Sequence, residues 1–197
     1  MKHVVFDIGA VLVDWQPHLA WSDELGDDGA RAFMDRVDFM ALNKRADNGE
    51  RFADLAEEIA DPEDRARFAT YVERYARTVV DAVPGTWAVL DRLKAKDVPI
   101  HAITNWSAET WPEGLKVHPR LDDVFGTLVV SGREHISKPD ARIFQILCER
   151  AEVPPHECVF IDDGPHNVEG AKAVGMDAIH FTGAKALEKE LMARNLL

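Results

Sequence analysis

Five short apolar runs, each followed by small or polar residues, restrict the fold of this chain more than any other feature of its sequence. They lie at positions 3–6, 99–103, 127–130, 158–161 and 178–181. The runs are rich in Val and Ile and carry apolar residues at successive positions, as strands do when both faces of a parallel sheet are buried. We therefore expect these five segments to form one buried sheet.

Helical periodicity precedes the second, fourth and fifth runs. Apolar residues recur there at helical spacing: Trp87, Leu90 and Leu93; Ile143, Phe144 and Leu147; Val168, Ala171 and Val174. Asp140 is suited to capping the second of these helices, and Gly175 is suited to ending the third. Strands that alternate with helices predict an α/β fold, here a Rossmann-like open parallel sheet with right-handed crossovers.

Positions 16–82 interrupt this alternation. Apolar residues repeat there at helical spacing only: Phe52, Leu55 and Ile59; Phe68, Val72, Tyr75 and Val79. We therefore predict an α/β core domain formed by residues 1–15 and 83–197, and an all-helical domain, residues 16–82, inserted after the first strand.

Composition and charge disfavour several kinds of partner. The 197 residues carry a formal net charge of −12, and their scattered Lys and Arg residues form no basic patch for nucleic acid or anionic lipid. No apolar run approaches the roughly 20 residues that span a bilayer, and the apolar stretch before Asp7 is too short for a signal peptide. The two cysteines form no CxxC motif, which makes a cysteine zinc site improbable. We expect a cytoplasmic protein.

Polar side chains suited to chemistry follow the first, second and fourth runs, and a lysine opens the helix after the third. Because the binding crevice of an open parallel sheet lies at the carboxyl ends of its strands, we expect these side chains to meet there. They are Asp7, Thr104, Asn105, Lys138, Asp162 and Asp163.

Three carboxylates and one lysine in a single crevice carry an excess of negative charge. Neighbouring carboxylates raise one another's pKa unless a cation neutralises them. Mg²⁺ prefers oxygen ligands and combines one or two carboxylates with substrate phosphate and water. The pattern favours phosphoryl transfer, in which a carboxylate attacks phosphorus while Lys138 and the metal absorb charge and Thr104 and Asn105 orient the group.

The same motifs, in this order, resemble those of the haloacid dehalogenase (HAD) superfamily, and the resemblance covers nearly the whole chain. The motifs are Asp7 with its turn, the strand that ends in Thr104-Asn105, Ser137-Lys138-Pro139-Asp140, and Phe160-Ile161-Asp162-Asp163 continuing through Asn167-Val168-Glu169-Gly170-Ala171. In that family, a helical insertion after the first strand is a cap that closes over the active site.

The resemblance implies a Mg²⁺-dependent phosphatase that acts on a small phosphorylated metabolite, such as a sugar phosphate, through an aspartyl-phosphate intermediate. Asp7 would be the nucleophile and a metal ligand, together with the Gly9 carbonyl and Asp163. Asp162 would lie in or near the metal shell, directly or through water. The phosphate-binding residues would be Thr104 and Lys138.

Gly9 departs from the family pattern. Most family phosphatases carry an aspartate two residues after the nucleophile, and this aspartate acts as general acid and base. A subgroup of glucose-1-phosphate phosphatase-like proteins instead shows an Asp-x-Gly pattern that is similar to that of this chain. General acid catalysis is typically worth about 10²–10⁴-fold in rate. We expect either a preference for leaving groups that need little protonation or a substitute acid, for which His166, Asp47 and Glu50 are candidates.

Several alternatives stay open. Arg45, in the insertion, is a candidate contact for the substrate and is equally compatible with a solvated surface charge. A metal-free 2-haloacid dehalogenase is a second possible function, although such enzymes usually have a Ser-Asn type sequence where this chain has Asp162-Asp163. A weakly catalytic relative that binds a phosphometabolite is a third. The substrate and the choice between monomer and homodimer are left undetermined.

Overall fold

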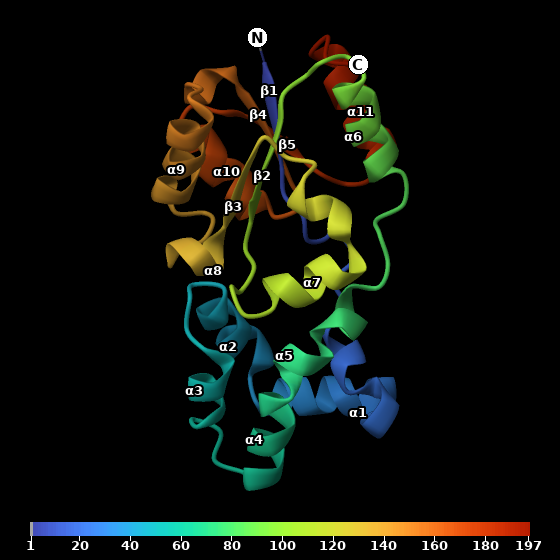
Figure 1. Cartoon of the computed structure of the whole chain (residues 1–197), viewed down its shortest axis with the longest axis vertical. Helices are drawn as coiled ribbons and strands as arrows, with labels where there is room; N and C mark the ends of the chain where they lie inside the picture. Colours follow the sequence, from blue (N-terminus) through green and yellow to red (C-terminus); the bar gives the residue numbers. More distant parts are fainter. Residues whose placement is uncertain (1) are drawn as a thin grey trace.

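The computed structural model describes residues 2–197, in which five parallel strands form one sheet (Figure 1). The strands are β1 (His3–Phe6), β2 (Ile100–Thr104), β3 (Thr127–Val130), β4 (Cys158–Asp162) and β5 (Asp177–His180). Their order in the sheet is β3-β2-β1-β4-β5. The predicted α/β fold with an open parallel sheet is confirmed.

Three strands differ from the expected bounds by one residue. β2 begins at Ile100 because Pro99 has no N–H to donate to the sheet ladder, although its carbonyl accepts the Val4 N–H at 2.9 Å. β4 extends to Asp162, which lies opposite His180 of β5, and β5 begins at Asp177. The pairing of Asp162 with His180 places the first acid of the Asp162-Asp163 pair within the sheet.

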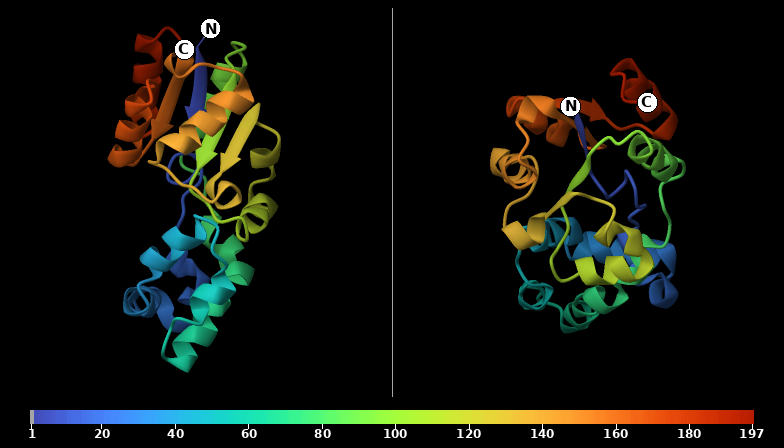
Figure 2. Two further views of the ribbon diagram at one scale, coloured as in Figure 1. Left: turned by 90° about the vertical axis from the view of Figure 1, so that its left-hand side faces the viewer. Right: turned by 45° about the horizontal axis from the view of Figure 1, so that its top comes forward.

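Helices cover both faces of the sheet, as the two turned views in Figure 2 show. On one face, Val4 and Phe6 of β1 pack in the same apolar cluster as α6 (Thr86–Lys94) and α11 (Ala184–Ala193). On the other, Val5 joins a cluster with α9 (Ala141–Ala151) and α10 (Pro165–Ala173). Successive residues of β1 thus point to opposite buried faces, which explains why the run is apolar throughout.

The helix ends follow the predicted chemistry. Asp140 caps α9, because its side chain accepts a hydrogen bond from the Arg142 N–H at 2.8 Å. Gly175, with φ 92°, takes the left-handed conformation just after α10. The remaining core helices are α7 (Trp111–Val117), α8 (Ser131–Glu134) and the 3₁₀ helices η3 (Pro119–Asp122) and η4 (Pro155–Glu157).

The segment from residue 16 to residue 82 contains helices and no strand of the sheet, and it lies beyond the carboxyl ends of the strands (Figure 1). Its elements are η1 (Pro17–Ala20), α1 (Ser22–Arg36), α2 (Phe39–Ala46), α3 (Phe52–Ala56), α4 (Pro62–Ala69), α5 (Tyr71–Arg74) and η2 (Tyr75–Val79). We call this segment, residues 16–82, the cap; the domain boundaries themselves stay a prediction. None of the helices in residues 2–197 combines the length and the apolar character needed to cross a membrane.

The strand order places the site. The chain runs from β1 outward to β2 and β3 and then crosses back to β4 and β5 on the other side of β1. The order therefore reverses between β1 and β4, and the crevice at such a switch point is where open α/β sheets bind ligands. Asp7 directly follows β1, Asp162 is the last residue of β4, and Asp163 comes directly after it.

Candidate active site

Asp7 stands at the carboxyl end of β1, next to β4. Its backbone N–H donates to the Ile161 carbonyl at 2.8 Å, which continues the sheet pairing by one residue. The side-chain Oδ1 accepts the Ile8 N–H at 2.6 Å. Asp7 is 7% exposed, and burial, together with the negative charge of Asp162, raises its pKa well above the usual range although Lys138 opposes the shift.

Lys138 lies between two carboxylates. Its Nζ is 2.8 Å from Asp7 Oδ1 and 2.7 Å from Asp162 Oδ2, and it also donates to the Ile103 carbonyl at 3.1 Å. Although burial alone would lower the pKa of Lys138, the two carboxylates outweigh it and raise the pKa. The ammonium group therefore stays charged and holds the ends of β1, β2 and β4 together.

Asp162 and Asp163 occupy different environments. Asp162 is fully buried, and its Oδ1 accepts hydrogen bonds from the Gly164 N–H at 2.8 Å and from Asn167 Nδ2 at 2.9 Å. With Lys138 on its Oδ2, both oxygens of Asp162 have protein partners. Asp163 is exposed, and burial of part of the side chain, together with the charge of Asp162, raises its pKa.

Asn105 positions Lys138. The Asn105 Oδ1 accepts the Lys138 N–H at 2.8 Å, and Asn105 Nδ2 donates to the Lys138 carbonyl at 3.1 Å. Both ends of the amide thus hold the lysine backbone beside β2, so the predicted contact of Asn105 with phosphate stays a prediction. Thr104 is buried at the end of β2, between β1 and β3.

Three carboxylates converge as a candidate metal site. One ligand oxygen from each of Asp7, Asp162 and Asp163 lies within 4.8 Å of the others. All the donors are carboxylate oxygens, which suit a hard divalent cation. Burial raises the pKa of Asp7 and of Asp163, and the charge of Asp162 adds to both shifts. The three carboxylates outnumber the single ammonium group of Lys138, so the donor set fits such a cation.

Comparison with known proteins identifies the family to which this arrangement belongs. A family model described as haloacid dehalogenase-like hydrolase matches residues 1–175. The chain belongs to the HAD-like hydrolases. It is thus an enzyme of the hydrolase class, and the sequence motifs that resemble those of the family lie at or near the carboxyl ends of its strands.

Relatives of this HAD-like hydrolase include phosphatases of similar length. A sesquiterpene phosphatase from Aspergillus oryzae is 26% identical over 96% of this chain and 94% of its own length. A fructose-1-phosphate phosphatase from Escherichia coli is 26% identical over 89% of this chain and 94% of its own length. Among shorter matches, an (S)-2-haloacid dehalogenase from Burkholderia cepacia is 28% identical over 52% of this chain and 44% of its own length.

Solved structures share the fold of the chain. A HAD family enzyme from Bacteroides thetaiotaomicron, in complex with magnesium and inorganic phosphate, superposes with a TM-score of 0.72. It is 18% identical, and the match covers 93% of this chain and 95% of that one.

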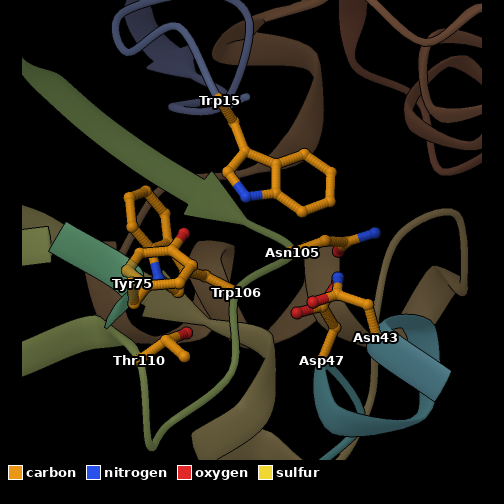
Figure 3. A pocket seen from close by; sticks show the side chains of 8 residues that line it. Trp15, Asn43, Asp47, Tyr75, Asn105, Trp106 and Thr110 are labelled. Atoms are coloured by element: carbon orange, nitrogen blue, oxygen red, sulfur yellow. The ribbon is translucent and has the colours of Figure 1, made fainter. Parts of the chain in front are cut away.

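A cavity of about 60 Å³ lies where the cap meets the core of the HAD-like hydrolase. Residues from both parts line it: Gly9, Trp15, Asn43, Asp47, Tyr75, Asn105, Trp106 and Thr110 (Figure 3). A volume of this size holds only a few waters. Three aromatic rings and four polar side chains therefore enclose a small space next to the Gly9 turn.

The sequence anticipated only part of this lining. Gly9, Asp47 and Asn105 were candidates from the sequence, but Asn43, Tyr75 and Thr110 carried no functional signal of their own. They belong to helical patterns or turns, and only the packing of η2 and α2 on the β2–α7 connection brings them together.

Two sequence candidates, Arg45 and His166, do not line this cavity. The Arg45 guanidinium pairs with Glu50 and Glu58 on the cap, at 2.5 Å and 2.7 Å. Contact of Arg45 with a substrate stays a prediction and would require it to leave these partners. His166 is exposed in the first turn of α10. Gly9, by contrast, lies in the turn after Asp7 and lines the cavity.

Proposed function

We propose that this HAD-like hydrolase is a Mg²⁺-dependent phosphatase that hydrolyses a small phosphorylated metabolite, such as a sugar phosphate, through an aspartyl-phosphate intermediate. The observation that carries the proposal is the convergence of Asp7, Asp162 and Asp163 around Lys138 at the switch point of the sheet. The phosphatases among the relatives and the magnesium and phosphate bound by the Bacteroides enzyme support it.

Each residue has a defined task in this reaction. Asp7 attacks phosphorus through a carboxylate oxygen, and Lys138 stabilises negative charge on the phosphoryl oxygens. Thr104 orients the phosphoryl group, while Asn105 holds the lysine backbone. Asp162 fixes the Lys138 ammonium group.

Asp7, Asp163 and the Gly9 carbonyl would hold Mg²⁺, with Asp162 in or near the metal shell. When bound, the metal supplies positive charge that neutralises the carboxylates and the phosphoryl oxygens. The same charge excess argues against a metal-free dehalogenase, because a carbon-centred displacement has no need for three carboxylates at one point. A cytoplasmic location stays a prediction from composition.

The proposal is tested by measuring phosphate and halide release in parallel. Purified protein is assayed with sugar phosphates, nucleotides, acyl phosphates and 2-haloacids, in Mg²⁺ and in EDTA. We expect phosphate release that requires Mg²⁺ and is lost in Asp7→Asn, whereas Asp54→Asn, which changes an exposed acid of the cap, retains it. Halide release that persists in EDTA, without phosphate release, would instead show a dehalogenase.

A further inference from the structure

The turn after Asp7 leaves an open space where a general acid is missing. Gly9 stands two residues after the proposed nucleophile and has no side chain. A Cβ built at Gly9 would meet nothing within 4 Å, and Gly9 itself lines the cavity between cap and core. The leaving group of a substrate attacked by Asp7 would therefore depart without a proton donor from this turn.

Asp47, which belongs to the cap, presents a carboxyl group to the same cavity. It follows the last residue of α2 and lies beside Asn43, with Trp15 and Asn105 nearby (Figure 3). Asp47 Oδ2 accepts a hydrogen bond from Asn43 Nδ2 at 3.1 Å. The Ser107 backbone N–H also donates to this carboxyl group.

Contacts with the core hold Asp47 in place. Ser131 Oγ donates to the Asp47 carbonyl at 2.5 Å, and the Asp47 N–H donates to the Asn43 carbonyl at 2.8 Å. Two residues further on, Gly49 packs so closely on His135 that a Cβ there would lie 2.1 Å from the imidazole Nδ1. The loop that carries Asp47 is thus fitted to the core by its backbone, and the carboxyl group enters the cavity from a defined position.

The protonation of Asp47 suits a general acid. Burial raises its pKa to about 7, while the Ser107 N–H and the positive charge of Lys138 act in the opposite direction. A carboxyl group of this kind is partly protonated near neutral pH and can both give and take a proton.

The other candidates for this role do not line the cavity. Glu50 is bound to Arg45 on the outer surface of the cap, and its pKa is lowered by that hydrogen bond. His166 is exposed in the first turn of α10 and does not line the cavity. Among the titratable side chains that line the cavity, Asp47 is the only carboxyl group in the part of the chain that the structure describes.

We propose that Asp47, supplied by the cap, replaces the acid missing at Gly9 and donates the proton to the leaving group, which makes esters of alcohols accessible as substrates. This inference depends on the proposed phosphatase function.

The proton and the electrons balance over two steps. In the first, an Asp7 oxygen forms a bond to phosphorus as the bond from phosphorus to the ester oxygen breaks. The electron pair stays on that oxygen, which takes the Asp47 proton and leaves as an alcohol. In the second, the Asp47 carboxylate accepts a proton from water as the water oxygen bonds to phosphorus. The bond to Asp7 breaks, and inorganic phosphate leaves.

A series of phosphate monoesters with leaving groups of increasing pKa tests the proposal, from 4-nitrophenyl phosphate through phenyl phosphate to glycerol phosphate. The wild type is compared with Asp47→Asn, with the control Asp54→Asn, and with the double variant Gly9→Asp/Asp47→Asn. Formation of a beryllofluoride adduct at Asp7 shows whether the nucleophile and its surroundings are intact in each variant.

We expect Asp47→Asn to lose about 10²–10⁴-fold in kcat on glycerol phosphate but only a few-fold on 4-nitrophenyl phosphate. The double variant should recover part of the alkyl activity, because an aspartate at Gly9 enters open space. An equal loss on all esters would show that Asp47 only supports the structure and would overturn the proposal. Absence of hydrolysis of any ester by the wild type would overturn both this inference and the proposed function.

Discussion

Lys138 shows how strongly a single residue can depend on its neighbours. Its ammonium group is almost fully buried and has two carboxylates and a carbonyl as partners. Burying a charge is costly unless it is paired and hydrogen-bonded. Because the Lys138 ammonium group contacts both Asp7 and Asp162, the three residues act as one electrostatic unit.

Replacing this lysine tests that unit through stability. Lys138→Met keeps the aliphatic volume but leaves Asp7 and Asp162 buried beside each other without a cation. In EDTA we expect the free energy of unfolding to fall by about 3–5 kcal/mol at pH 8. The loss should be smaller at pH 6, because the raised pKa of Asp7 lets it take up a proton.

Urea denaturation measures the change in stability. Lys172→Met, which removes an exposed lysine paired with Glu169 on α10, is the matched control and should change stability by less than about 1 kcal/mol. A similar small effect for both substitutions would contradict the electrostatic role assigned to Lys138.

Two titratable side chains, His3 of β1 and His101 of β2, contact each other across neighbouring strands. His3 Nδ1 and His101 Nε2 lie 2.9 Å apart, and the rings stack with centroids 5.2 Å apart. Burial, together with the charge of His3, lowers the pKa of His101 to about 4. Burial also lowers the pKa of His3, although Glu157 acts in the opposite direction.

This pair makes stability depend on pH. Between pH 6.5 and about 4 the unfolded chain binds a proton that folded His101 does not, so the free energy of unfolding falls as the pH decreases through that window. We expect His101→Gln to reduce this loss by about 2–3 kcal/mol, as measured by urea denaturation across the range. The exposed His156, replaced in the same way, serves as the control. Identical pH profiles for His101→Gln and the wild type would show that the lowered pKa of His101 does not cause this pH dependence.

At the scale of the whole molecule, cap and core form one packed structure. A single apolar cluster contains Trp21, Phe33 and Phe39 of the cap together with Val4 and Phe6 of β1. Polar contacts join the two parts near the cavity. This close fit accounts for the small volume of the cavity and brings Asp47 of the cap into its lining together with Gly9.

Glu109 is one of these polar contacts. Its Oε2 accepts the N–H of Phe52, the first residue of α3, at 2.6 Å. In Glu109→Ala we expect faster amide hydrogen exchange across residues 47–56, by about tenfold or more, because a hydrogen bond to a charged group contributes about 1.5–3 kcal/mol. Exchange in β1 and β4 should not change.

Glu113→Ala is the matched control for this measurement, since Glu113 pairs with Lys116 within α7. Equal acceleration in both variants, or none in Glu109→Ala, would show that the Glu109 contact does not hold the cap on the core.

The amino-acid sequence by itself determined the class of fold and the chemistry at the strand ends. Whether a residue favours a buried strand or a helix depends mainly on its near neighbours, so the apolar runs and the helix caps were predictable to within one residue. The acids and the lysine were recognisable because they directly follow such runs, and parallel strands bring their carboxyl ends to one edge.

Only the tertiary structure decided the order of the strands, the pairing of Lys138 with Asp7 and Asp162, and the position of Asp47, rather than Glu50 or His166, in the lining of the cavity with Gly9. The sequence pattern left these three acids equivalent, because the direction of a cap side chain depends on contacts with residues far along the chain. Ser131 and His135, more than eighty residues from Asp47, fit the α2–α3 loop to the core. The cavity exists because segments with no sequence relation pack against one another, and local propensities contain no record of that packing.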